Sequence, residues 1–351
     1  MQPTRSFFST LSLACALLFA ATLGLGCPRA VHKRVRPASG GQWQVLRTLD
    51  LSQMQSGISL GAPQFALDPD GRYIWILEPG RRRVLHIDLA GSADRVLDVT
   101  SREEIKSKLA SVVALGMSEL GRLCIVIVDR DYGASALQRG GPQIAYRAIK
   151  YDDNLHPVAS TKFMIPSIQS QAINSIASAG DDTLYVLSSA GTGEADTQVL
   201  SCFDEAGKAQ WSLSGSSGTP IPYALSPLVL HNDTLEMQGF TEHFGRVVAI
   251  SSIEGKDKAT PLASVNGFDL LGIDERGNII VSDYDTSKGP ESLVVASILE
   301  YAPTGELVST TPLPVALYPR DLTRSVLISA AGDYFLVALD FEGKVNIYTY
   351  R

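Results

Sequence analysis

Short apolar runs, tight polar turns and β-rich runs alternate along the chain from Phe65 to its end. The unit returns about every fifty residues and holds an apolar run, a turn of Asp, Asn or Gly, and a second run rich in Val, Ile, Leu and Tyr. Six copies are present, at Phe65–Leu77, Val113–Val128, Ile176–Leu187, Leu228–Met237, Leu271–Val281 and Val326–Leu339. This period is typical of a repeated unit of four short strands. The pattern therefore predicts an all-β chain folded as a six-bladed β-propeller.

A second turn in the first five units separates a third strand from a fourth. These turns are Leu89–Gly91, Asp152–Leu155, Asp204–Gly207, Glu254–Gly255 and Pro303–Gly305. The sixth unit ends with Val345–Arg351 and is one strand short. Trp43–Leu51 alternates like a strand ahead of the first unit, so we expect it to complete the last blade. Closing the ring in this way removes exposed sheet edges.

Two runs also give the chain a family resemblance. Ile273–Asp283 and Phe203–Trp211 are similar to the turn-and-strand repeats of six-bladed propellers in the NHL, TolB-like and YVTN-like superfamily, and residues 43–351 resemble that superfamily as a whole. The second run is similar also to repeats of quinoprotein and outer-membrane-assembly propellers. The resemblance implies a fold, and a fold does not fix an activity.

The first residues form a region of different character. Arg5 precedes an apolar run, Leu11–Leu25, with small residues before Cys27, which is the layout of a secretory signal. Leu23–Cys27 resembles a bacterial lipobox, which implies that Cys27 is lipidated, although Gly24 stands where that motif usually has Leu. Simple cleavage is the alternative. We expect a signal peptide at 1–26, a lipidated Cys and flexible basic tether at 27–42, and the propeller domain at 43–351.

The resemblance to lipoproteins also implies a location. Pro28 follows the cysteine where an Asp would commonly signal retention in the inner membrane, so the expected location is the outer membrane, facing the periplasm or the cell surface. The tether carries Arg29, Lys33, Arg34 and Arg36. These cations either lie on anionic lipid headgroups or only keep a linker solvated.

Composition and charge narrow the class of partner. The chain is 45% hydrophobic and 19% charged, as in ordinary globular proteins, and its formal net charge is −7. Removing the signal makes the charge more negative still, because it takes away Arg5 and no acidic residue. An acidic propeller is poorly suited to nucleic acid. The expected partners are a protein or glycan of the cell envelope, and the membrane itself through the lipid anchor.

An acidic residue ends the second strand in four of the six units. These residues are Glu78, Asp129, Asp283 and Asp340, with Ser188 and Gly239 at the other two places. Radial blades would bring the four carboxylates into a ring, which could hold a hard cation or a cationic ligand. Alternatively, each carboxylate accepts hydrogen bonds from the neighbouring loop.

Other candidate binding residues lie in the loops that follow the same strands. Arg81, Arg82 and Arg83 could grip a carboxylate, a phosphate or a lipopolysaccharide group by bidentate hydrogen bonds. Tyr132 and Tyr284 could form an adaptable rim, and His243 is the best histidine for a ligand-facing imidazole. A solvated loop surface is the alternative reading for each of them.

Enzymatic chemistry is the second functional hypothesis. A metal-dependent hydrolase or lactonase-like propeller would use Asn174, Asp269 and Asp283 as ligands, although no spacing selects them. Asp283–Gly289 fails as an EF-hand, because Lys288 and Val294 stand where Gly and Glu are required, but a looser Ca²⁺ site or another divalent metal stays open. A quinone-cofactor dehydrogenase is supported by one repeat only. We assign no catalytic residue and no cofactor, and we favour a non-enzymatic binding or scaffold module.

Two cysteines remain after the signal and Cys27. Cys124 is expected in the second strand of unit two and Cys202 in the third strand of unit three. Buried free thiols are favoured there, with a disulfide as the alternative.

Overall fold

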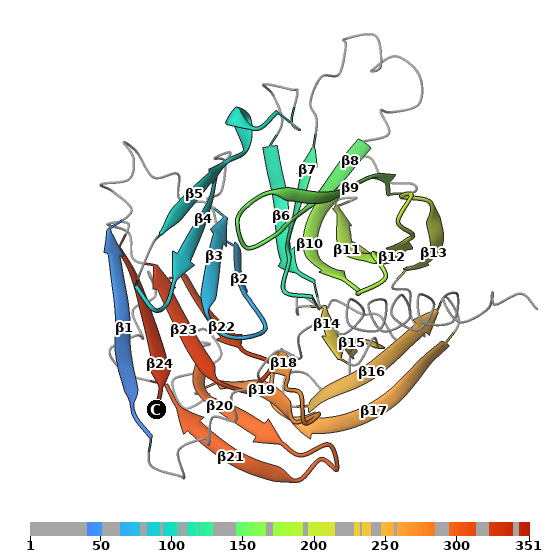
Figure 1. Cartoon of the computed structure of the whole chain (residues 1–351). Helices are drawn as coiled ribbons and strands as arrows, with labels where there is room; N and C mark the ends of the chain where they lie inside the picture. Colours follow the sequence, from blue (N-terminus) through green and yellow to red (C-terminus); the bar gives the residue numbers. More distant parts are fainter. Residues whose placement is uncertain are drawn as a thin grey trace, which may run out of the picture. The chain divides into compact units, whose positions relative to one another are not determined.

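The computed structural model describes the propeller domain in segments. They are residues 41–50, 64–77, 83–91, 94–103, 105, 111–118, 120–128, 145–165, 171–191, 196–214, 228–231, 234–239, 247–255, 258–284, 295–313, 323–339 and 344–351. These segments form six four-stranded antiparallel sheets arranged as a six-bladed β-propeller, which confirms the predicted fold class (Figure 1). The only helix in this part of the chain is the short 3-10 turn η1 (Val99–Ser101). None of the described helical structure is long and apolar enough to cross a membrane.

Strands A to D run outward in each blade, in chain order except in the last. Blade 1 holds β2 (Gln64–Leu67), β3 (Tyr73–Leu77), β4 (Arg83–Asp88) and β5 (Arg95–Asp98). Blade 2 holds β6 (Ser111–Met117), β7 (Leu123–Val128), β8 (Ala145–Tyr151) and β9 (Pro157–Met164), and blade 3 holds β10 (Gln171–Ser178), β11 (Leu184–Gly191), β12 (Asp196–Phe203) and β13 (Ala209–Ser214). Blade 4 holds β14 (Val229–His231), β15 (Thr234–Gly239), β16 (Val247–Gly255) and β17 (Lys258–Asn266), and blade 5 holds β18 (Leu270–Ile273), β19 (Ile279–Tyr284), β20 (Val295–Tyr301) and β21 (Leu307–Pro312). Blade 6 holds β22 (Thr323–Ile328), β23 (Tyr334–Leu339), β24 (Lys344–Tyr350) and, as its outer strand, β1 (Trp43–Asp50).

The recurrent Asp and Gly positions lie in similar tight turns, which repeat from blade to blade. In blades 1, 2, 5 and 6 the first residue of the turn is Asp or Ser, and its side-chain oxygen accepts the backbone N–H four residues later, as in Asp68 with Arg72 and Asp274 with Asn278. In blade 3 the turn begins at Ala179, and the Asp181 carboxylate accepts the Thr183 N–H instead. A left-handed residue follows within the turn, at Gly71, Gly121, Asp182, Gly277 and Gly332. Asp caps such turns with its side chain, and Gly adopts positive φ without steric cost. This local chemistry is why the turns were visible in the sequence.

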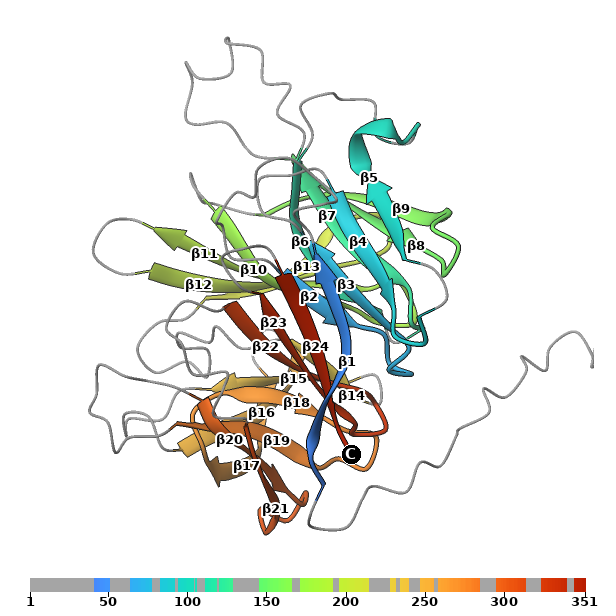
Figure 2. The ribbon, with the colours of Figure 1, turned by 90° about the vertical axis from the view of Figure 1, so that its left-hand side faces the viewer.

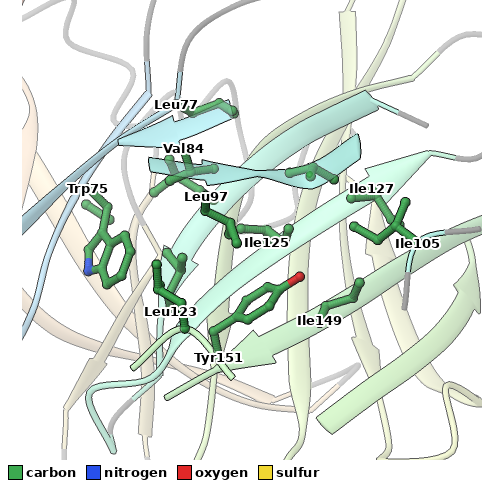
Figure 3. Close-up of a cluster of buried hydrophobic side chains, with 14 residues drawn as sticks. Trp75, Leu77, Val84, Leu97, Ile105, Leu123, Ile125, Ile127, Ile149 and Tyr151 are labelled. Carbon is green, nitrogen blue, oxygen red and sulfur yellow. The ribbon is translucent and has the colours of Figure 1, made fainter. Parts of the chain in front are cut away.

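Six apolar clusters hold the ring together, and each lies in the seam between two neighbouring blades. Strand β3 shows the cause, because its residues alternate between two faces. Ile74 and Ile76 pack against Phe335 and Val337 of blade 6, whereas Trp75 and Leu77 pack towards blade 2 (Figure 3). Each fully buried Ile or Leu contributes about 1.5–3 kcal/mol. Both faces of every blade are therefore needed for the fold.

The N-terminal strand closes the ring as expected. Strand β1 pairs with β24 from Trp43 opposite Tyr350 to Asp50 opposite Lys344, and the two lie side by side in Figures 1 and 2. The Arg47 guanidinium makes a bidentate pair with Asp94 of blade 1, at 2.6 and 2.8 Å. On the other side, Trp43 Nε1 donates to the Pro312 carbonyl of blade 5 at 2.7 Å. One strand thus ties the last blade to both of its neighbours.

The inner strands of blades 2 and 3 approach each other unusually closely. Ser118, directly after β6, and Ser178, in β10, form a parallel bridge. A Cβ at Gly116 would lie 2.6 Å from the Ile176 carbonyl oxygen, which is too close for any other residue. Gly116 is therefore required by the packing of the two strands.

We expect Gly116→Ala to lower the free energy of unfolding by about 1–3 kcal/mol, because it overpacks this contact. The matched control is Gly272→Ala in the inner strand of blade 5, where the nearest atom to the added methyl group is 3.4 Å away. The control should leave stability unchanged or raise it by up to about 1 kcal/mol. Urea denaturation of the three proteins measures the difference, and equal stability of both variants would contradict the prediction.

Candidate functional site

The two ends of the blades differ in the length of the segments that connect the strands. At one end, the turn end, A joins B and C joins D by short turns such as 68–72, 118–122, 152–156 and 302–306. At the other, the loop end, strand B joins C and strand D joins the next A. The longest connections leave from the loop end, at 51–63, 129–144, 215–228, 285–294 and 313–322. Binding residues gather in long loops set on a rigid scaffold, so the loop end is the candidate site.

The predicted acidic ring is described at one of its four carboxylates. Asp283 lies within β19, opposite Ser297, and is half-buried. Glu78, Asp129 and Asp340 come directly after β3, β7 and β23 and lie outside the described residues. Counted from the first residue of strand B, Asp283 is four residues later, Glu78 is five later, and Asp129 and Asp340 are six later. The predicted ring therefore combines three different positions along strand B.

One position assigned to this ring is corrected by the structure. Strand β11 continues to Gly191, so Ser188 lies inside the strand instead of at its end. Its side chain is buried, and its hydroxyl donates to the Val199 carbonyl at 3.3 Å. The sequence was misleading here because Ser188 is the first polar residue after an apolar run.

Asp269 and Asp283, two of the three metal-ligand candidates, do not converge. Asp269 precedes β18, and its carboxylate accepts a hydrogen bond of 3.3 Å from the Ser282 hydroxyl. Successive side chains of a strand point to opposite faces, so Asp283 points away from the face where Ser282 meets Asp269. Asn174, the third candidate, lies at a β-bulge in β10, two blades away. Within the described segments, His, Cys, Asp and Glu form no group of three or more that could hold a metal ion.

The remaining candidates are only partly described. Arg83 begins β4, and its Nε lies 3.9 Å from an Asp98 carboxylate oxygen, with both side chains partly exposed. Such a surface pair contributes at most about 1 kcal/mol and leaves the guanidinium accessible. Tyr284 ends β19, and its side chain is not among the described ones. Cys27, Arg81, Arg82, Tyr132 and His243 lie outside the described residues.

The sequence did not reveal a buried position that repeats in every blade, where five residues are polar and one is a cysteine. It lies in strand C, two residues before the C/D turn or the chain end, and its side chain is buried each time. The six residues are His86, Lys150, Cys202, Ser252, Glu300 and Thr349. A single polar residue directly before a large apolar one, such as Tyr151 or Phe203, was the available signal. Each side chain points into the seam with the next blade.

Two of these residues carry charge, and both are matched by groups across their seams. The Lys150 ammonium lies 2.5 Å from an Asp182 carboxylate oxygen, joining blade 2 to the A/B turn of blade 3. The Glu300 carboxylate accepts hydrogen bonds from Asn278 at 3.0 Å, from Ser309 at 2.9 Å and from Tyr334 of blade 6 at 3.2 Å. Both groups thus join neighbouring blades.

The two cysteines are free and buried, in strands B and C of neighbouring blades as predicted. Burial raises the pKa of the Cys124 thiol to about 12 and that of Cys202 to about 11. Both thiols are therefore protonated at neutral pH and are poor nucleophiles.

The comparisons with known proteins show a similarity in fold alone. No family model matches the chain, and no curated protein matches its sequence. A calcium-binding protein, regucalcin from Agrobacterium tumefaciens, is similar in structure at 12% identity and a TM-score of 0.50, over 88% of this chain and 93% of that one. A luciferin-regenerating enzyme is similar at 15% identity and a TM-score of 0.49, over 89% and 95%. At such identity the first likeness supports the propeller architecture alone.

The Lys150–Asp182 pair gives an asymmetric prediction. The Lys150 side chain is 4% exposed and that of Asp182 is 36% exposed. Asp182→Asn leaves the buried Lys150 cation without a negatively charged partner and should lower the free energy of unfolding by about 3–5 kcal/mol. Lys150→Met leaves a carboxylate that water can reach, so its stability should stay within about 1 kcal/mol of the parent. Asn is the right replacement because Asp182 has φ of 67°, which Asn tolerates.

Guanidinium denaturation of both variants checks this prediction. The double variant Lys150→Met/Asp182→Asn is the control, and it should recover most of the stability that Asp182→Asn loses. A larger loss for Lys150→Met than for Asp182→Asn would contradict the assignment.

Proposed function

We propose that this chain is an exported lipoprotein, anchored through Cys27, whose propeller binds a protein or glycan partner in the cell envelope. In this proposal residues 1–26 are the signal peptide, residues 27–42 are the tether, and the outer membrane holds the anchor. The propeller acts as a non-enzymatic scaffold. The partner face is the loop end of the blades.

The observation that carries the proposal is the contrast between the two ends of one rigid ring. Short, repeated turns occupy the turn end, and the long connections, with nearly all candidate binding residues, belong to the loop end. Arg83 supplies a cation there, and the neighbouring Arg81 and Arg82 add two more in sequence. Guanidinium groups recognise carboxylates and phosphates by paired hydrogen bonds.

The entry of the tether supports the same arrangement. Gln42 pairs with the C-terminal residue, since its N–H donates to the Arg351 carbonyl at 2.6 Å and Arg351 donates back at 3.1 Å. Strand β1 then starts at Trp43, opposite Tyr350, at the turn end of blade 6. The proposed tether therefore joins the propeller at the turn end of blade 6, which is the end opposite the proposed partner face.

Lipidation is tested by fractionation. Cys27→Ala removes the thiol that would carry the acyl chains, and burying these chains contributes about 0.8 kcal/mol per CH₂ group. We expect the variant to move from the membrane fraction to the soluble fraction, as seen by immunoblotting of both. Cys124→Ala is the matched control and should leave the protein in the membrane fraction. An unchanged distribution of Cys27→Ala would overturn the anchor.

Partner binding is tested by crosslinking the tagged full-length protein in native membranes and identifying captured proteins and glycans by mass spectrometry. Replacing 129–144 by a short hairpin connection should abolish a stoichiometric partner by removing part of the loop end. Replacing the turn 204–208 with a different tight turn should not. Capture that survives every loop-end replacement would overturn the assignment of the face, and stoichiometric metal in the purified domain would favour an enzyme instead.

A further inference from the structure

The seam between blades 1 and 2 buries a histidine whose ring nitrogens have no hydrogen-bond partner in the described part of the chain. His86 lies in β4, opposite Trp75 on one side and Arg95 on the other, and is 2% exposed. Residues directly opposite one another in a sheet point to the same face, so His86 shares the face of Trp75. That face belongs to the cluster of Leu123 and Tyr151 from blade 2, shown in Figure 3.

Two aromatic rings enclose the imidazole. Its ring centroid lies 4.0 Å from that of Trp75, in a stacked arrangement, and 4.5 Å from that of Tyr73. Neither imidazole nitrogen has a hydrogen-bond partner among the described residues, and the same holds for Trp75 Nε1. An unsatisfied buried polar group costs about 1–3 kcal/mol, and a buried charge without partners costs more.

The charged groups around His86 come from both blades. Arg95 lies beside it in β5 and donates to the Asp153 carbonyl of blade 2 at 3.3 Å. The acidic neighbours are Asp88 and Asp94 of blade 1 and Asp153 of blade 2. Burial, followed by the Arg95 charge, holds the pKa of His86 below its ordinary value, and the three carboxylates only partly oppose this shift. The imidazole is therefore neutral in the closed seam.

The same position in the other blades is chemically different. Lys150 and Glu300 are matched by charge or by hydrogen bonds, and Cys202, Ser252 and Thr349 carry no charge at neutral pH. Within the described strand-C positions, His86 is thus the one group that gains a charge between neutral and mildly acidic pH.

We propose that acid opens the seam between blades 1 and 2 ahead of the other five, because protonation of His86 creates a buried charge with no hydrogen-bond partner among the described residues. The direction of the pH effect follows from the linkage between protonation of His86 and opening of the seam. A group whose pKa is lower in the closed state stabilises that state fully above the open-state value, about 6.5, and loses its contribution as the pH falls. The opening constant rises about tenfold per pH unit below 6.5, until the pH reaches the closed-state value. The inference depends on the fold alone and not on the lipid anchor.

Hydrogen–deuterium exchange of the intact protein between about pH 8 and pH 5 tests the proposal. His86→Phe keeps the aromatic stack and cannot titrate, and comparing it with the parent at each pH cancels the intrinsic pH dependence of exchange. We expect parent and variant to keep a constant exchange ratio above about pH 6.5. Below it the parent should exchange faster, about tenfold per unit, in peptides of β3, β4, β7 and β8.

Two controls keep the test decisive. His156→Gln changes a histidine of blade 2 whose side chain is 74% exposed, and it should behave as the parent. His86→Leu serves if the Phe variant fails to fold. Equal acid dependence of parent and His86 variants would overturn the proposal, and so would an acid effect spread evenly over all six blades.

Discussion

The ring depends on the two-faced character of its blades. A sheet that is apolar on both faces cannot leave either one in water, so every blade needs a neighbour on each side. The six seam clusters meet this need, including the one in which Phe335 and Val337 of the last blade pack on Ile74 and Ile76 of the first. Since the last blade lacks an outer strand of its own from the C-terminal side, strand β1 completes it. Closure is thus a requirement of packing.

Polar groups distinguish seams that are otherwise built alike. One strand-C position points into each seam, and the residue there decides how that seam responds to its surroundings. Lys150 with Asp182 gives an ion pair, and Glu300 forms a network that reaches Tyr334. At His86 the ring nitrogens remain unsatisfied within the described structure. Packing therefore sets the common architecture, and single buried groups set the local sensitivity to charge and pH.

Three of the outer strands, β1, β5 and β9, each contact the segment between strands C and D of the next blade. Arg47 reaches Asp94, Arg95 reaches the Asp153 carbonyl, and Thr161 donates to the Glu205 carbonyl at 3.1 Å. These contacts join neighbouring blades at the turn end, whereas the long connections lie at the loop end. A rigid ring with variable loops on one side suits recognition, and the chemistry of those loops sets what is recognised.

The sequence alone determined the six units, their turns and the closing strand, because alternation and turn chemistry are local. Gly71, Gly121 and Gly277 adopt left-handed conformations in their turns, and this preference of glycine does not depend on how the blades are arranged. The candidate site was predicted as named residues at strand ends and in loops, without the direction of each side chain. Asp269 and Asp283 were grouped as metal ligands, yet Asp269 meets Ser282 on one face of the sheet and Asp283 points to the other, because successive side chains of a strand alternate. Only the tertiary structure decided that Lys150 of blade 2 meets Asp182 of blade 3, and that the face shared by His86 and Trp75 is buried against blade 2. Such encounters depend on the twist and packing of whole blades, which no local pattern encodes.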